Sequence, residues 1–325
     1  MIAIVAIAIA AGAASALMFV SIASGAVISL VLRGLAPLPL MVAAIGWGPL
    51  TAAIGGIAAT TVFLLLFGFP FGLAFAASTA LPAWWLGHLA MLGRPLPNPA
   101  PARNGATAPA VAMEWYPAGR LLLWIAVIGA LLALWSLFKI DTDPEAIAAA
   151  MKNDFANVAR AFAQRGYAVD ESLVDTMGAL APLVVPMPPI IILTVNLWLA
   201  GRIAVTSGRL NRPWPDLKST ALPPLTLVAL CVAVALCFTG GLPALFAKVV
   251  TGALLMAYAF TGLAVLHTLT LASSNRVIWL VFTYTATIVL MMWPLLIMVV
   301  LGLADALFGF RERFMRTRPP PLPAA

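Results

Sequence analysis

Long runs of apolar residues, separated by short breaks rich in glycine, proline and arginine, dominate the chain. Several runs reach or exceed the roughly 18–20 residues that an α-helix needs to cross a bilayer. Spanning helices are predicted at about residues 2–24, 27–45, 49–67, 73–92, 120–138, 180–202, 222–238, 245–271 and 277–303. The pattern therefore predicts an all-α fold, a polytopic transmembrane helical bundle of about eight or nine spans.

Some of these spans contain residues that disfavour a regular helix. The second span is interrupted by Arg33, Gly34 and the Pro37–Pro39 step. The glycines and proline of residues 68–72 predict a tight turn between the third and fourth spans. Because proline removes a backbone donor, irregular backbone is also expected at the start of the 180–202 span, which contains Pro182, Pro186, Pro188 and Pro189.

One hydrophilic insertion of substance, residues 139–177, interrupts the apolar pattern. Asp143 can cap a helix whose first residue is Pro144, and Gly166 is predicted to end that helix. Its large apolar residues recur at helical spacing on one face: Ile147, Met151, Phe155, Val158 and Phe162. We expect one amphipathic extra-membrane helix at 144–165, which either packs on its own protein or binds a partner.

A stretch with six prolines divides the chain. We expect N-terminal transmembrane helices at 1–92 and C-terminal transmembrane helices with the insertion at 119–310. Residues 93–118 are predicted to be a mobile Pro/Ala-rich linker that buries nothing. Residues 311–325 form a basic, proline-rich tail.

Composition excludes a soluble globule of this size. Of the 325 residues, 63% are hydrophobic and 9% are charged, whereas a soluble domain has about 25% charged residues. The net charge of +7 indicates basic loops beside anionic headgroups rather than a nucleic-acid partner. We therefore expect the lipid bilayer as the main partner and a multi-pass location in a bacterial cytoplasmic (inner) membrane.

The distribution of arginine and lysine predicts the orientation. Residues 94–120 and 202–218 are basic and separated by two predicted crossings, whereas the insertion between them is acidic on balance. The positive-inside rule therefore places the linker and the 202–218 loop in the cytoplasm. The basic C-terminal tail conflicts with three further crossings, which favours an even number of spans in all.

No catalytic set is visible in the sequence. His88 and His267 are far apart, and no HExxH, GxSxG or P-loop string occurs. Cys231 and Cys237 lie six residues apart in an apolar run and are interpreted as buried small apolar residues. We expect no enzyme activity, no cofactor and no metal site.

Polar groups inside or at the ends of spans are the main candidates for function, because their burial in lipid is costly. Asn196 lies in the middle of a span, and Arg202 follows at the end of the same span. Asp305 lies at the end of the last span, six residues before Arg311. An Asp305–Arg311 contact would close one end of the bundle, or alternatively couple it to a partner.

Small residues at four-residue spacing predict close helix contacts or docking faces. One such stripe is Ala6, Ala10 and Ala14, and a second is Gly48, Ala52 and Gly56, extended by Thr60. In a chain rich in alanine, packing within the molecule is the first interpretation, and docking of a membrane partner is the second.

Four segments carry a resemblance to a known family: LPAWWLGHLA at 81–90, NLWLAGRI at 196–203, RPWPDL at 212–217 and GLADALFGFRERF at 302–314. The chain resembles the YybS-like family of bacterial membrane proteins, in its alphaproteobacterial form, for which no activity is established. The resemblance implies N-terminal helices similar to substrate-binding subunits of energy-coupling-factor transporters. Such subunits dock a coupling partner through an AxxxA face, which Ala6, Ala10 and Ala14 would match.

Two functional hypotheses follow. The first is a membrane subunit that binds a small molecule, transporter-like but without its own ATPase. The alternative is a non-transporting scaffold or biogenesis factor that acts through protein partners, using the helix at 144–165 and the basic loops.

The predicted topology can be tested by cysteine labelling. In a chain whose native cysteines are replaced by serine, Ser207→Cys and Gly166→Cys should react with an impermeant maleimide from opposite sides of the membrane, because one predicted span separates them. Labelling of both positions from the same side would contradict this topology.

Overall fold

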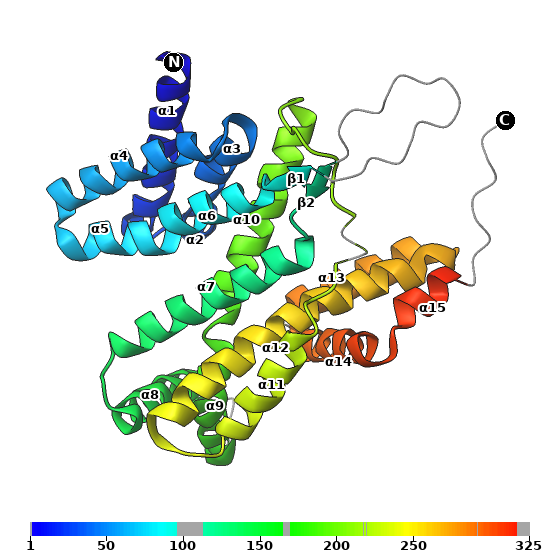
Figure 1. The fold of residues 1–325 in the computed structure, drawn as a ribbon. Coiled ribbons are helices and arrows are strands. Elements are labelled where there is room, and N and C mark those ends of the chain that lie inside the picture. Colours follow the sequence, from blue (N-terminus) through cyan, green and yellow to red (C-terminus); the bar gives the residue numbers. More distant parts are fainter. Residues whose placement is uncertain are drawn as a thin grey trace. The chain divides into compact units, whose positions relative to one another are not determined.

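A computed structural model describes residues 2–95, 113–164, 170–216, 218, 220–290 and 292–316. In this part of the chain helices dominate, and the only strands are a short two-stranded ribbon (Figure 1). The chain divides into two compact units, residues 1–125 with 191–215 and residues 126–190 with 216–325. The predicted division at the linker is thus not the division into units, because residues 191–215 group with the N-terminal helices.

The first unit is built on the N-terminal hairpins. Its elements are α1 (Ile2–Val20), α2 (Val27–Gly34), α3 (Leu38–Trp47), α4 (Pro49–Phe67), α5 (Phe69–Phe75), α6 (Leu81–Ala90), β1 (Gly93–Pro95) and β2 (Met113–Trp115). Two long helices, α7 (Ala118–Phe138) and α10 (Met187–Thr206), have residues in both units. Within the unit, α1 packs against α4 and α3, and α3 packs against α6.

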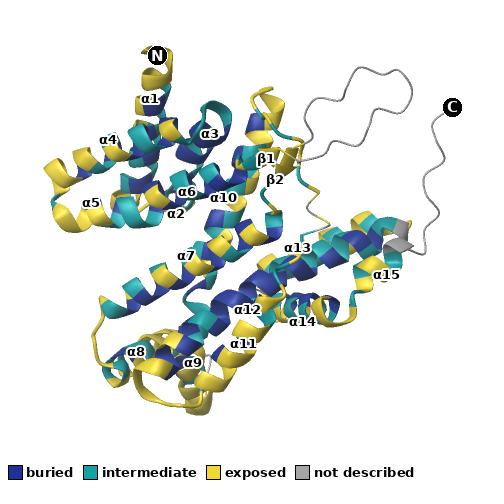
Figure 2. Ribbon diagram, in the orientation of Figure 1, coloured by how far each residue is buried: buried dark blue, intermediate teal, exposed yellow. Residues whose placement is uncertain are grey.

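The second unit is organised around one long, mostly buried helix, α12 (Gly241–Leu269) (Figure 2). Helices α8, α9, α11, α14 and α15 pack against it. The bounds of the unit's other helices are α8 (Pro144–Ala163), α9 (Glu171–Val184), α11 (Leu225–Leu236), α13 (Arg276–Leu290), α14 (Met292–Phe308) and α15 (Phe310–Arg316).

The prediction of a polytopic helical membrane bundle is confirmed. Among the described residues, seven helical segments are long and apolar enough to cross a membrane, and three shorter apolar helices accompany them. Large apolar side chains cover the outside of both kinds of helix: Leu65 in α4 and Ile288 in α13 are each 79% exposed. A water-facing surface does not tolerate this, whereas a lipid-facing surface requires it. The exact number of crossings stays a prediction.

Glycines bring the backbones of neighbouring helices into direct contact. A Cβ added to Gly262 of α12 would overlap the carbonyl of Met298 in α14, and one added to Gly302 would overlap the carbonyl of Tyr258. In the first unit, Gly12 of α1 meets Gly55 of α4 in the same way. Lipid supplies no hydrophobic drive for association between helices, so close packing at small residues takes its place.

The predicted break in the second span is confirmed. Helix α2 ends at Gly34 and α3 begins at Leu38. The tight turn predicted at 68–72 is wrong in extent: α5 already begins at Phe69, and the reversal is made by Gly68, whose φ is +83°. Pro70 fits the first turn of α5, where a backbone donor would have no partner in any case.

The irregular backbone expected near residue 180 is confined to a shorter segment. Pro182 lies inside α9, a helix of 14 residues that the sequence analysis did not predict. Pro188 and Pro189 lie in the first turn of α10, where proline is tolerated. The break between the two helices is reduced to residues 185–186.

The amphipathic helix α8 begins as predicted. The Asp143 carboxylate accepts hydrogen bonds from the backbone N–H groups of Glu145 and Ala146. Helix α8 ends at Ala163, while the predicted stop at Gly166 lies outside the described residues.

Helix α8 packs on α9, where Lys152 of α8 forms an ion pair with Asp175 of α9 at 2.7 Å. The hydrogen bond that the Lys152 ammonium donates to the Asp175 carboxylate raises the pKa of this exposed lysine.

The ends of the predicted linker are ordered, which corrects the expectation that it buries nothing. Strands β1 and β2 pair antiparallel, and Arg94 forms a 2.7 Å ion pair with Glu114. Gly93 packs against the ring of Trp115. Residues 96–112, the centre of the linker, lie outside the described residues. The predicted tail at 311–325 begins inside α15. Its residues 317–325 lie outside the described residues.

The contact between α12 and α14 predicts a sharp asymmetry between two substitutions on α14. Gly302→Leu should lower the free energy of unfolding in detergent by about 1–3 kcal/mol or more, because the side chain has no space beside Tyr258. The exposed Ala306→Leu on the same helix should leave it unchanged. Chemical unfolding in a neutral detergent measures the free energy for both variants, and a Gly302→Leu variant as stable as the wild type would contradict this packing.

Candidate functional site

A buried carboxylate–guanidinium pair closes one end of the second unit. Asp305 near the end of α14 and Arg311 in α15 form an ion pair at 2.7 Å, with side chains only 7% and 13% exposed. Asp305 Oδ2 also accepts from Arg311 Nε at 2.8 Å, and Oδ1 accepts from the Arg311 backbone N–H at 2.9 Å. The tight turn between the helices uses Gly309 at a φ of +63°. The contact predicted from the spacing of these residues is therefore present.

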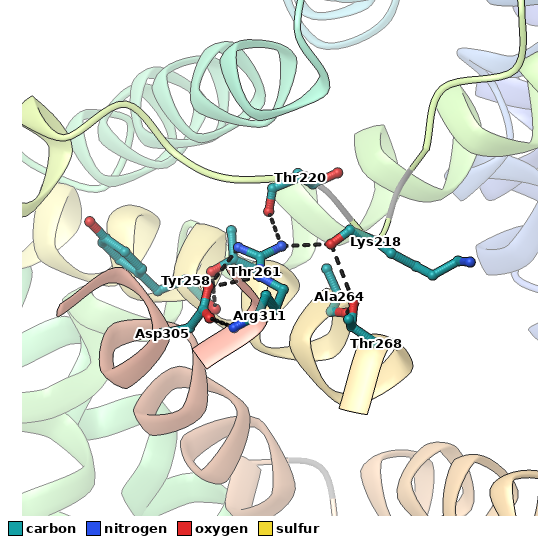
Figure 3. A network of polar contacts seen from close by, with 8 residues as sticks. All are labelled: Lys218, Thr220, Tyr258, Thr261, Ala264, Thr268, Asp305 and Arg311. Atoms are coloured by element: carbon teal, nitrogen blue, oxygen red, sulfur yellow. Dashed lines mark hydrogen bonds and ion pairs between the residues drawn. The ribbon is translucent and has the colours of Figure 1, made fainter. Parts of the chain in front are cut away.

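The same arginine ties the chain segment before α11 to this corner (Figure 3). Arg311 Nη1 donates to the carbonyl oxygens of Lys218 at 2.7 Å and Thr220 at 2.8 Å. The hydroxyl of Thr268, on α12, donates to the Lys218 carbonyl as well, at 3.5 Å. We call Asp305, Arg311, Lys218, Thr220 and Thr268 the corner clasp.

Beside the corner clasp, polar side chains connect the buried faces of α11 and α12. The hydroxyls of Thr226 and Tyr258 lie 3.0 Å apart, and Tyr258 is only 2% exposed. Thr261 donates to the backbone carbonyl of Tyr258 at 2.8 Å. Every one of these groups has a hydrogen-bond partner among the described residues, so the arrangement holds the helices together. The corner clasp likewise fastens α14 and α15 to the segment before α11.

A different arrangement surrounds Asn196 in the first unit. The Asn196 side chain is 1% exposed, and Nδ2 donates to the carbonyls of Gly34 at 2.8 Å and Ile192 at 2.7 Å. Gly34 is the last residue of α2, where the break in the span leaves carbonyls without helical donors. Within the described residues, Oδ1 of Asn196 is buried and has no hydrogen-bond partner. Asn196 thus supports the break and retains one unused acceptor.

The residue before Gly34 adds a positive charge at this break. Arg33 donates from Nη2 to the Ser78 hydroxyl at 3.4 Å, and its guanidinium lies 3.8 Å from the centre of the Phe19 ring. Ser78 belongs to a π-helical turn, Ala76–Ala80, between α5 and α6. Interrupted helices and π-turns within spans are frequent at functional sites. We call Arg33, Gly34, Ser78 and Asn196 the broken-span site.

Arg33 was missed as a site residue, although the sequence contains a signal for it. It is the only charged residue among the first 93, apart from neutral His88. A charge placed at membrane depth costs about 2.5–3.5 kcal/mol on insertion scales. The sequence pattern indicated Arg33 only as an interruption of the second span.

The other predicted polar residue on α10 is not part of the broken-span site. Arg202 is exposed, and its guanidinium lies 5.5 Å from the centre of the Trp214 ring. Nearby in the chain, Arg212 donates to the Ala90 carbonyl and lies over the Trp115 ring at 5.4 Å. Burial lowers the pKa of the Arg212 guanidinium from its ordinary value.

The two predicted stripes of small residues differ in burial. On α1, Ala6 and Ala10 are exposed and Ala14 is half-buried. The packed face of α1 is a different one, formed by Ala8, Gly12, Ser15 and Phe19. Packing within the described chain therefore does not use Ala6 and Ala10, and docking of a partner there stays a prediction.

The stripe on α4 lies largely inside the first unit. Ala52 and Gly56 are buried, and Gly48 and Thr60 are half-buried. A Cβ added to Gly56 would lie 3.1 Å from the Cβ of Ala80 in the π-turn. This face therefore packs against the segment that holds Ser78.

Comparison with known proteins adds no assignment: no family model, no curated protein and no solved structure matches the chain. Across the described ranges, no group of three or more His, Cys, Asp or Glu residues could hold a metal ion.

The two cysteines of α11 and its end are free thiols. Cys231 is exposed and Cys237 is half-buried, so the expected burial of Cys231 is wrong.

The corner clasp predicts a large difference between two ion pairs of equal length. Asp305→Asn should lower the free energy of unfolding by about 3–5 kcal/mol, because it leaves the Arg311 charge buried without a counter-charge. Asp175→Asn, which breaks the exposed pair with Lys152, should have no measurable effect. Chemical unfolding in a neutral detergent compares them, and equal stability of the two variants would contradict a buried clasp.

Proposed function

We propose that the protein is a membrane subunit that binds a small molecule in its first unit, transporter-like and without an ATPase of its own. One observation carries this proposal: at the broken-span site, a span stops at Gly34 and resumes at Leu38 beside a π-turn. Irregular backbone at membrane depth persists only where protein or a water-filled cavity satisfies it. The two irregular segments meet through Arg33 and Ser78.

The position of these residues along their helices supports the proposal. Asn196 lies at the middle of α10, and Ser78 lies at the middle of the 69–90 span. Four segments distant in sequence, α1, α2, the π-turn and α10, contribute to the site through Phe19, Arg33, Ser78 and Asn196. Binding sites near the midplane, formed by discontinuous helices, are the recurring arrangement in secondary transporters.

A second candidate function, a scaffold that acts through protein partners, is favoured by α8. Only Ile147 of its apolar stripe is buried, whereas Phe155, Val158 and Phe162 are 37%, 54% and 47% exposed. This half of the stripe is available to a partner helix or to the membrane surface.

The relationship to the YybS-like family and the location in a bacterial inner membrane stay proposals as well. The seven long apolar helices support a membrane location in general. Docking of a coupling partner on Ala6 and Ala10 is compatible with their exposure on α1.

The proposed function is tested by what the purified protein retains. Protein extracted in a mild neutral detergent should release a stoichiometric small molecule on denaturation, identified by mass spectrometry. Ser78→Leu should abolish its retention by filling the site, whereas Arg202→Gln, at an exposed position of α10, should not. Wild-type protein that is empty in every detergent but co-purifies with a partner lost on Phe155→Ser substitution would favour the scaffold instead.

A further inference from the structure

We infer that Arg33 binds an oxyanion, a carboxylate or phosphate group, within the broken-span site; this inference rests on the proposed function and specifies its ligand class. The first observation is the positive charge of Arg33, which has no carboxylate partner in its unit. The first unit contains a single acidic residue, Glu114, which is already paired with Arg94. No carboxylate of this unit is therefore available to compensate Arg33.

The described residues give the half-buried Arg33 side chain few contacts. Among the described residues it makes one hydrogen bond, of 3.4 Å, to the Ser78 hydroxyl, and one stacking contact with Phe19. A guanidinium carries five N–H donors in a fixed planar fork that matches carboxylate and phosphate oxygens. Most of this donor capacity is unused within the described residues.

Aromatic packing around Phe19 holds the Arg33 guanidinium in position. Phe19, beneath it, is 7% exposed and lies edge-on to Phe63 and Phe75, at 5.3 and 5.2 Å between ring centres. Stacking on an aromatic face holds the guanidinium in place while its N–H edges stay available. The site is therefore preorganised for a planar or tetrahedral oxyanion.

The fold also indicates toward which end of the first unit the Arg33 side chain leans. Side chains on a helix lean toward its N-terminus, so Arg33 points toward the start of α2 at Val27. Phe19 and Phe63, near the ends of α1 and α4, lie at the same end of the unit. Gly25 and Gly68 lie in the connections at this end, between α1 and α2 and between α4 and α5. Both a soluble anion and a lipid headgroup phosphate have this oxyanion chemistry.

Paired probes test the charge requirement in purified protein at constant ionic strength. Benzoate and inorganic phosphate should raise the unfolding temperature of the wild type, whereas benzamide, the uncharged counterpart of benzoate, should not. Arg33→Gln should weaken benzoate binding by at least about tenfold, Arg33→Lys less, and Arg202→Gln not at all. Equal responses of wild type and Arg33→Gln to benzoate would overturn the inference.

A second measurement needs no variant. Phenylglyoxal modifies accessible arginines, and peptide mass spectrometry follows Arg33 and Arg202 separately. Phosphate should slow the modification of Arg33 severalfold and leave that of Arg202, which is exposed over Trp214, unchanged. Equal rates at Arg33 with and without phosphate, together with no response to benzoate, would overturn the inference even if Arg33→Gln fails to fold.

Native mass spectrometry distinguishes the sources of the anion and separates this inference from the proposed function. Arg33-dependent retention of added phosphatidylglycerol, with no competition from phosphate or benzoate, would identify a lipid headgroup, and this supports the oxyanion but contradicts a soluble ligand. A neutral molecule retained equally by wild type and Arg33→Gln would overturn the oxyanion and support the proposed function. Wild-type protein that retains nothing and responds to no probe would overturn both.

Discussion

The structure depends on one constraint, that lipid cannot hydrogen-bond to a peptide group. Each span must satisfy its backbone internally, and each interruption needs a partner from the protein. The break after Gly34 meets this requirement through Asn196, whose side chain donates to the Gly34 carbonyl at 2.8 Å. In the corner clasp, Arg311 and Thr268 both donate to the Lys218 carbonyl, which fastens the loop before α11 to α12 and α15.

The same solvent explains how the helices are held together. Apolar side chains gain little by leaving lipid for protein, so close backbone contact replaces hydrophobic burial as the main attraction between spans. The pairs Gly12–Gly55 and Gly262–Gly302 provide it in the two units. Buried ionic contact is restricted to Asp305 and Arg311 among the ion pairs of the described residues, at a helix corner where a turn would otherwise leave backbone groups unpaired.

The sequence predicted those features that follow from local patterns. The apolar runs gave the spans, Asp143 predicted the start of α8, and the spacing of Asp305 and Arg311 predicted their contact. It did not predict α9, because four prolines near residue 185 suggested irregular backbone. In the structure Pro182 lies inside α9, Pro188 and Pro189 lie in the first turn of α10, and Pro186 lies in the short break between them. Nor did the sequence predict that Arg33 and Ser78 meet, because a hydrogen bond across 45 residues depends on tertiary packing. The packed face of α1 was missed because small residues recur at equal spacing on several faces of this helix. Only its contact with α4 shows which face is buried.

The central claim is that the second span is broken inside the membrane and held there by a neighbouring helix. Electron cryomicroscopy of the protein in lipid nanodiscs tests it most directly, by resolving residues 27–47 relative to the lipid. The account predicts that α2 ends at Gly34 near the bilayer midplane, with the Asn196 amide within hydrogen-bond distance of the Gly34 carbonyl. A continuous helix from Val27 to Trp47, or a break that lies outside the lipid, would contradict it.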